Sequence, residues 1–256
     1  MRELHRKKRL LTLKELSEEL YASVICYPRP SKAGLEVRLK ELQKLGVKAL
    51  EFSGDKQAFN IPVLGKGCVG IVIIAHRKRE KAALKIRRVD ADRTQMQHEA
   101  EMLKKANLVN VGPKLLGVSK NFLLMQFIDG VLLPKWLDIR EGKSRIVMVL
   151  REVLEQCWRL DKTGLDHGEL SYAPKHIIIN QKDEPVIVDF ETASVNRKPS
   201  NVTSISQFLF ISGAVAKEVA EKLDRKDRKA LIEALKNYKK DRTRENFGSV
   251  LTVCGL

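Results

Sequence analysis

The sequence of 256 residues predicts an α+β fold in which a strand-rich part precedes a mainly helical part. Three observations favour this organisation. Short apolar runs punctuated by glycine fill residues 61–86, helical periodicities fill residues 143–162 and 204–238, and a hairpin pattern lies between them at residues 177–188. A chain of this length can bury a substantial core. We therefore expect a two-lobed unit with a small N-terminal addition.

The N-terminal addition, residues 1–58, is predicted to contain two amphipathic helices followed by a strand. Leucines recur at helical spacing over residues 10–26 behind Thr12, which is expected to cap the first helix. Ser31 is expected to cap the second helix, and Gly46 to end it. This order resembles a winged helix-turn-helix. A helical cap on the next domain is the alternative interpretation.

The charge balance is strongly basic, because Lys and Arg together number 48 against 32 for Asp and Glu, a formal net charge of +16. Such an excess attracts polyanions. A dense mixture of charges also suits the ion-pair networks of a thermophile. The predicted phosphate-binding cations of the first domain are Arg2, the N-terminal arm Arg6, Lys7, Lys8 and Arg9, and then Arg38, Lys40 and Lys44.

Targeting and redox signals are few. No apolar run approaches the roughly 20 residues of a membrane span, and the basic N-terminus lacks the apolar core of a signal peptide. We expect a cytoplasmic protein that does not bind membranes. Cys26, Cys68, Cys157 and Cys254 form no C-x-x-C pair and are expected to be free thiols.

A glycine-rich turn opens the predicted strand-rich lobe, residues 59–130. A G-x-G-x-x-G pattern is weak evidence alone, because dinucleotide-binding folds and kinases share it. Here a second apolar run follows the glycines rather than a helix, and a third strand comes next. This order is that of a glycine hairpin folded over phosphates in a kinase N-lobe. The glycines are Gly65, Gly67 and Gly70.

A lysine and a glutamate follow the hairpin in the order expected for that lobe. Lys85 lies on the third strand, where it would contact the α- and β-phosphates of a nucleotide. Residues 91–106 are predicted to be helical, and Glu99 is the preferred partner of Lys85, with Glu101 second. Separately these residues would be ordinary surface charges. Their order after the glycine hairpin carries the interpretation.

Two further strands are predicted at residues 111–118 and 121–130. The main chain of Gln126 and Ile128 would form the hinge that hydrogen-bonds a nucleobase, with Met125 behind the base. An ordinary buried strand has the same side-chain pattern, because main-chain groups would make these contacts.

Polar residues gather at one end of the hairpin pattern in residues 177–188. His176 directly precedes the first strand and Asp189 directly follows the second. If Ile177 pairs with Val188, the two polar residues meet. Asp189 would then be a metal-binding carboxylate. A surface hairpin with scattered polar residues is the alternative.

The motifs from residue 65 to residue 191 resemble the protein-kinase-like fold, especially the small Rio-type kinases. The runs His-Gly-Glu-Leu from residue 167 and Val-Asp-Phe-Glu from residue 188 are similar to those of an archaeal family of tRNA kinases. Members of that family phosphorylate a ribose 2′-hydroxyl. The resemblance implies a bilobal kinase-like fold, with residues 59–130 as the N-lobe and residues 131–256 as a mostly helical C-lobe.

The resemblance also implies a role for each motif residue. Gly65, Lys66, Gly67 and Gly70 would cradle the phosphates, and Lys85 would pair with Glu99. Glu169 lies where kinases place the catalytic aspartate, with Asp166 as the second candidate base. His176 replaces the usual asparagine beside the metal ligand Asp189, and Lys175 would neutralise charge on the transferred group.

The leading hypothesis is a phosphotransferase that moves the γ-phosphate of ATP or GTP to a 2′-hydroxyl of tRNA, in the variable-loop region, with Mg²⁺ or Mn²⁺ as cofactor. No Ala-Pro-Glu sequence follows Glu191, and little room is left for a peptide-docking region. No obligate protein partner is inferred. A Rio-like protein kinase or ATPase is the first alternative. An RNA-binding pseudokinase is the second.

Overall fold

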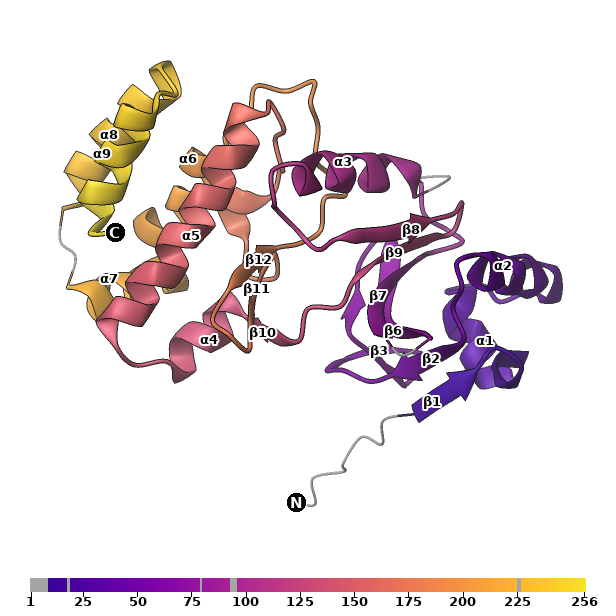
Figure 1. The fold of residues 1–256 in the computed structure, drawn as a ribbon. Coiled ribbons are helices and arrows are strands. Elements are labelled where there is room, and N and C mark those ends of the chain that lie inside the picture. The colour runs from indigo at the N-terminus through magenta and orange to yellow at the C-terminus, as the bar shows by residue number, and fades with distance from the viewer. Residues whose placement is uncertain (1–8, 18, 79, 93–95, 225–226) are drawn as a thin grey trace. The chain divides into compact units, whose positions relative to one another are not determined.

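The computed structural model describes residues 9–17, 19–78, 80–92, 96–224 and 227–256. The chain divides into two compact units (Figure 1). Of the described residues, the first unit takes those up to residue 101 and residues 114–127, and the second takes residues 102–113 and 128–256. The predicted phosphate contacts Arg2, Arg6, Lys7 and Lys8 lie outside the described residues.

The first unit is built on a seven-stranded sheet in the order β1-β2-β6-β7-β9-β8, with β5 paired to β6. A separate hairpin joins β3 and β4. The strands are β1 (Arg9–Thr12), β2 (Ala49–Phe52), β3 (Lys56–Ala58), β4 (Ile61–Val63), β5 (Gly65–Lys66), β6 (Gly70–Arg77), β7 (Glu80–Arg87), β8 (Leu115–Val118) and β9 (Phe122–Gln126). The helices are α1 (Glu19–Ile25), α2 (Lys32–Lys44) and the start of α3 (Gln97–Asn107), and a 3₁₀ turn, η1 (Glu15–Ser17), precedes α1.

Alternating side chains of β9 explain why helices cover the two faces of this sheet. Phe122 and Leu124 belong to a buried cluster that includes side chains of α1 and α2. Leu123 points the other way and packs against Met96 and against Ala100 of α3. Since successive strand residues face opposite sides, one apolar strand serves two cores.

The N-terminal segment differs from the prediction at its start. The predicted helix from residue 10 begins only at Glu19, because residues 9–12 form β1 and pair antiparallel with β2. Thr12 is not a helix cap, since its N–H and hydroxyl both donate to the Glu15 carboxylate at 2.7 Å. The second helix is confirmed, with Ser31 accepting from the Gly34 N–H as its N-cap.

Arg38 does not serve as the phosphate contact that the sequence suggested. Its side chain is buried, and it donates to the carbonyl oxygens of Ile25 and Arg87 at 2.7 Å and to Asn121 Oδ1 at 3.1 Å. The guanidinium therefore ties α1 and α2 to β7 and to the start of β9. Lys40 and Lys44 on the same helix are exposed.

Replacing Arg38 with Leu is expected to lower the free energy of unfolding by about 2 to 3 kcal/mol, because the carbonyl oxygens of Ile25 and Arg87 would lose a charged donor. Urea denaturation measures the change. Lys40→Leu, on the exposed part of the same helix, is the control and should stay within about 0.5 kcal/mol of the parent. Equal effects of the two substitutions would contradict a structural role for Arg38.

The second unit holds a three-stranded sheet and most of the helices. The sheet order is β10-β11-β12, formed by β10 (Gly130–Leu132), β11 (Ile177–Asn180) and β12 (Pro185–Ile187). The helices are α4 (Leu133–Ile139), α5 (Lys143–Lys162), α6 (Asn201–Ser206), α7 (Ala214–Leu223), α8 (Arg228–Lys240) and α9 (Arg244–Cys254), with a 3₁₀ turn, η2 (Leu170–Tyr172), and a π-helical turn, η3 (Gln207–Ile211).

The predicted hairpin is present, with a register one residue from the expected one. Ile177 pairs with Ile187 rather than with Val188, and the Val188 N–H donates to the His176 carbonyl at 2.9 Å. His176 and Asp189 therefore still flank the open end of the hairpin.

Free thiols and the lack of a membrane span are two further predictions from the sequence. All four cysteines are free, and three of them are buried, while Cys68 in the glycine-rich turn is exposed. Within the described residues, no helix combines the length and the apolar character needed to cross a bilayer.

Candidate active site

The glycine-rich turn is a tight hairpin of the first unit. Gly65 pairs with Val72 across the strands, and the Gly67 N–H donates to the Gly70 carbonyl at 2.8 Å. Lys66 and Gly67 are exposed. The Gly67 carbonyl also accepts from Arg88 Nη1 at 3.2 Å, so the hairpin presents the exposed tip at residues 66–68, with its lysine, to solvent. A cation at such a tip suits a phosphate-binding loop.

Gly70 makes room for the lysine on the neighbouring strand. A Cβ at Gly70 would lie 3.0 Å from the Ile86 carbonyl oxygen and 3.1 Å from Lys85 Cγ, closer than side chains normally pack. The third glycine of the pattern is thus required by the packing of Lys85.

The predicted pair of Lys85 and Glu99 is formed. Lys85 Nζ lies 2.8 Å from Glu99 Oε2 and 3.0 Å from Oε1, and both side chains are buried. Glu101, the second candidate partner, is exposed on α3. A buried ammonium held by a carboxylate has a fixed position, which suits a group that must meet phosphate oxygens.

The predicted hinge lies where β9 ends. The Gln126 N–H donates to the Lys114 carbonyl at 2.8 Å, and its side-chain Oε1 accepts from the Lys114 N–H at 3.2 Å. The Gln126 N–H is therefore engaged within the sheet. Ile128 is the first residue of the longer segment of the second unit. The role of both residues in binding a nucleobase remains a prediction.

In the second unit, the loop at residues 166–170 is held by a buried histidine. The His167 N–H donates to Asn201 Oδ1 at 2.8 Å, its Nε2 lies 3.1 Å from the Val188 carbonyl, and its carbonyl accepts from the Thr192 hydroxyl. Burial lowers the pKa of His167 to about 4, so its imidazole is neutral at neutral pH. No sequence motif signals this anchoring role of His167.

Gly168 turns the chain between this anchor and the predicted base. Its φ of +92° lies in the region that favours glycine, and a Cβ would approach Thr192 Oγ1 to 2.9 Å. The turn exposes part of Glu169, whose side chain keeps 38% of its accessible surface. Glu169 is thus placed at the surface by a turn at position 168 that only glycine can adopt without strain.

The three predicted chemical groups of this unit meet. Ligand atoms of Glu169, His176 and Asp189 all lie within 4.8 Å of one another, and His176 Nε2 is 3.0 Å from Glu169 Oε2. His176 is buried, and its Nδ1 has no hydrogen-bond partner among the described residues. Lys175 is exposed beside it.

The electrostatics of His176 keep a nitrogen lone pair available. Burial lowers its pKa, an effect that the nearby Asp189 and Glu169 carboxylates oppose. A neutral imidazole can act as a metal ligand. Asp189 itself has a φ of +71°, an uncommon conformation for a residue other than glycine and one that clusters at functional sites. Two carboxylates and an imidazole can together hold a divalent cation.

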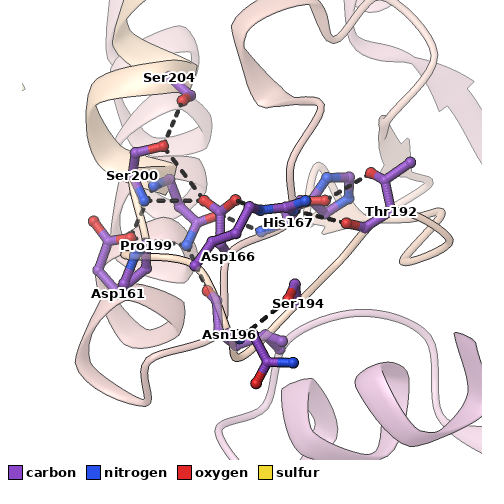
Figure 2. A network of polar contacts seen from close by, with 12 residues as sticks. Asp161, Asp166, His167, Thr192, Ser194, Asn196, Pro199, Ser200 and Ser204 are labelled. Atoms are coloured by element: carbon purple, nitrogen blue, oxygen red, sulfur yellow. Dashed lines mark hydrogen bonds and ion pairs between the residues drawn. The ribbon is translucent and has the colours of Figure 1, made fainter. Parts of the chain in front are cut away.

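Asp166, the second candidate base, has a structural role instead. Figure 2 shows its carboxylate at the centre of a polar network, where Oδ2 accepts from Arg197 Nε at 3.0 Å and Oδ1 accepts from the Ser200 N–H at 3.0 Å. Its main chain pairs with that of Ser194 in both directions. Because Asp166 is buried and holds these donors, it is not positioned to take a proton from a substrate.

The same network holds residues 190–200, the segment between Asp189 and α6. Arg197 also donates to the Thr192 carbonyl at 2.7 Å, and Ser200 contacts Ser204 in α6 (Figure 2). The segment is short, and hydrogen bonds hold it at several points along its length. The long activation segment that positions peptides in many protein kinases has no equivalent at residues 190–200.

A buried aspartate supports Asn201, the residue that holds the loop. Asp161 at the end of α5 accepts from the Asn201 N–H and Nδ2 at 2.8 Å, and from the Tyr238 hydroxyl at 2.9 Å. The series of hydrogen bonds through Tyr238, Asp161, Asn201 and His167 thus links α8 to the loop at residues 166–170. No sequence motif signalled these partners, because they are distant along the chain.

Together these features define a class. In the first unit, a lysine lies beneath a glycine hairpin and pairs with a helix glutamate. In the second unit, a loop carboxylate precedes a hairpin that ends in an aspartate with a strained backbone. These are the parts of a protein-kinase-like phosphotransferase. Residues 73–206, about half of the chain, match the model of the RIO domain, and the chain belongs to this family of nucleotide-dependent kinase-like enzymes.

The chain is also similar to an uncharacterized protein of Methanocaldococcus jannaschii. The two are 32% identical over 118 residues, which is 45% of this chain and 99% of that protein.

Proposed function

We propose that the protein transfers the γ-phosphoryl group of ATP or GTP to a ribose 2′-hydroxyl of tRNA, within the variable-loop region. The observation that carries the proposal is the cluster of Glu169, His176 and Asp189, which lies beside a short, tied segment rather than beside a peptide-docking platform. The glycine hairpin and the pair of Lys85 and Glu99 support nucleotide binding by the first unit.

In this reaction the 2′-oxygen forms a bond to the γ-phosphorus, and the bond from that phosphorus to the β,γ-bridging oxygen breaks. Nucleoside diphosphate leaves with the bridging oxygen. Glu169, partly exposed, orients the hydroxyl and takes its proton. Lys85 holds phosphate oxygens, and Lys175 offsets charge on the transferred group.

Asp189 and His176 would hold the divalent cation. When bound, such a cation neutralises charge on the β- and γ-phosphate oxygens. The donor set fits Mg²⁺ through its carboxylates, whereas the imidazole favours Mn²⁺ and softer ions. We therefore expect Mn²⁺ to bind at least as well as Mg²⁺.

His176→Asn should weaken Mn²⁺ binding about tenfold or more while retaining Mg²⁺ binding, because an amide oxygen replaces the imidazole. Electron paramagnetic resonance of free Mn²⁺ measures binding without reference to activity. His98→Asn, an exposed histidine on α3, is the control. Unchanged Mn²⁺ affinity in His176→Asn would remove His176 from the site.

The basic charge of the chain favours RNA as the acceptor. A formal net charge of +16 is attractive to a phosphate backbone, and a splayed nucleotide of a folded RNA can present a 2′-hydroxyl to a partly exposed base. Phosphate contacts position such a substrate without reading its sequence.

Membership of the RIO domain family favours a second candidate, a Rio-like protein kinase or ATPase. The same residues would then transfer the phosphoryl group to a protein hydroxyl or to water, and the basic surface would serve docking. A pseudokinase that only binds RNA would retain the nucleotide fold without transfer.

One assay separates these candidates. Nucleotide labelled in its γ-phosphate is offered with total tRNA and a mixed protein substrate, and label is followed into RNA, protein and free phosphate. Label in tRNA supports the proposal. Label only in protein, or only in free phosphate, supports the second candidate, and no transfer despite RNA binding supports a pseudokinase.

A further inference from the structure

One face of α8 combines cationic and apolar side chains. Arg228, Ile232, Leu235, Lys236 and Lys239 recur at the three- and four-residue spacing that places side chains on one side of a helix. All five line a single hollow of about 380 Å³. We call these five residues the α8 stripe. Ile232 is an exposed large apolar residue, with 36% of its surface accessible.

The other wall of the hollow comes from the α6 and η3 segment. Thr203 in α6 and Gln207 and Ile211 in η3 line it, so polar groups and an apolar side chain face the stripe. A second hollow of about 440 Å³ shares Ile211 and Arg228 with the first. A π-helical turn is rare and often marks a functional site, and here it lines both hollows.

Cationic side chains outnumber acidic ones around the hollow. Asp227 is engaged as the N-cap of α8, accepting from the Ala230 N–H at 2.8 Å, and Glu233 pairs with Lys236 at 3.2 Å. The α8 stripe contributes three cations, and Lys229 and Lys240 are exposed on the same helix. The stripe therefore suits an anionic ligand with flat or apolar parts.

The hollow is connected to the loop at residues 166–170 through one helical segment. α6 begins at Asn201, whose side chain accepts from the His167 N–H. Thr203 and Gln207 follow on the same segment, on the order of 3 and 9 Å further along a helix axis at 1.5 Å per residue. A large acceptor bound at the hollow would thus be held by the same segment that orders the loop.

We infer that the α8 stripe and its hollow form an RNA-docking surface, an inference that rests on the proposed function. Backbone phosphates would contact Arg228, Lys236 and Lys239, and an unstacked base would enter the hollow against Ile232. Gln207 Nε2 donates to Ser212 Oγ at 2.7 Å, so Gln207 would offer its Oε1 to the edge of the base. An acidic helix would instead require a longer apolar groove with several successive anchors. The chemistry of the hollow favours RNA.

The test is tRNA binding by fluorescence anisotropy across a series of salt concentrations, without nucleotide. The variant Arg228→Gln, Lys236→Gln, Lys239→Gln is expected to bind about tenfold to a hundredfold more weakly and to reduce the salt slope by about two to three, near 0.7 to 0.9 per lost phosphate contact. Lys104→Gln, Lys105→Gln, Lys162→Gln removes three exposed lysines elsewhere in the same unit and is the control. Unchanged binding by the first variant, or an equal loss in the control, would overturn the inference.

A second variant tests the hollow itself. Ile232→Asp should weaken tRNA binding about fivefold or more by placing a carboxylate where the base enters, whereas Ile232→Met should not. Equal binding by both variants would overturn the assignment of the hollow. Preferential binding of polyglutamate over tRNA would overturn the inference in favour of an acidic protein. Binding is measured apart from transfer, so a loss of tRNA affinity in the stripe variant together with absent phosphorylation would reject only the proposed reaction.

Discussion

Replacing Asp189 with Asn is expected to lower phosphoryl transfer by about 10³-fold or more while leaving RNA affinity nearly unchanged. The substitution keeps the shape of the side chain and removes the negative charge that would hold the divalent cation. Charge stabilisation by a bound metal is worth several kcal/mol, and each 1.36 kcal/mol is tenfold in rate. Single-turnover transfer of labelled γ-phosphate measures the rate, and anisotropy measures RNA binding.

The control is Asp138→Asn, which changes the charge equally at an exposed position on α4. Its rate should match that of the parent. If Asp189→Asn retained more than a tenth of the activity, Asp189 would not be the metal ligand. A parallel loss of RNA affinity would instead point to a disturbed structure at the left-handed position that Asp189 occupies.

The substitution Lys85→Met is expected to have the second largest effect on transfer, a loss of about 10² to 10³-fold, because it removes the preorganised charge that we propose contacts the phosphates. It also leaves the buried Glu99 carboxylate without the ammonium at 2.8 Å, which should lower stability. Rate and thermal unfolding must therefore be measured together.

The double variant Lys85→Met, Glu99→Leu separates the two effects. Removing both charges should recover much of the lost stability, since a buried pair is replaced by apolar groups, but it should not recover the rate. Recovery of activity in the double variant would mean that Lys85 acts only through folding. If the double variant did not recover stability, the loss of rate could not be assigned to lost phosphate binding. That outcome would count against the proposed role of Lys85.

Local patterns were the most predictable parts of the molecule. The glycine hairpin, the pair of Lys85 and Glu99 and the approach of His176 to Asp189 each follow from the spacing of residues within one or two neighbouring elements. The hairpin register was wrong by one residue, yet the polar residues still met, because both lie at the same end of paired strands.

Contacts between distant segments were not predictable from the sequence. Asp166 is a plausible base by position, but its carboxylate oxygens accept hydrogen bonds from Arg197 and Ser200. Asp161 and Asn201, which together hold the loop at residues 166–170, lie 40 positions apart in the chain and belong to no motif. Arg38 resembled a surface cation because its helix is otherwise basic, although its guanidinium satisfies buried carbonyl groups.

The identity of the phosphorylated atom tests the account most directly. After labelling, tRNA is digested with alkali, which cleaves only where a free 2′-hydroxyl can attack the adjacent phosphate. A phosphorylated 2′-hydroxyl blocks cleavage at its own linkage, so we expect the label in one alkali-resistant dinucleotide, and none when Asp189→Asn replaces the parent enzyme. Label confined to protein, to free phosphate or to an RNA end would contradict a 2′-hydroxyl kinase.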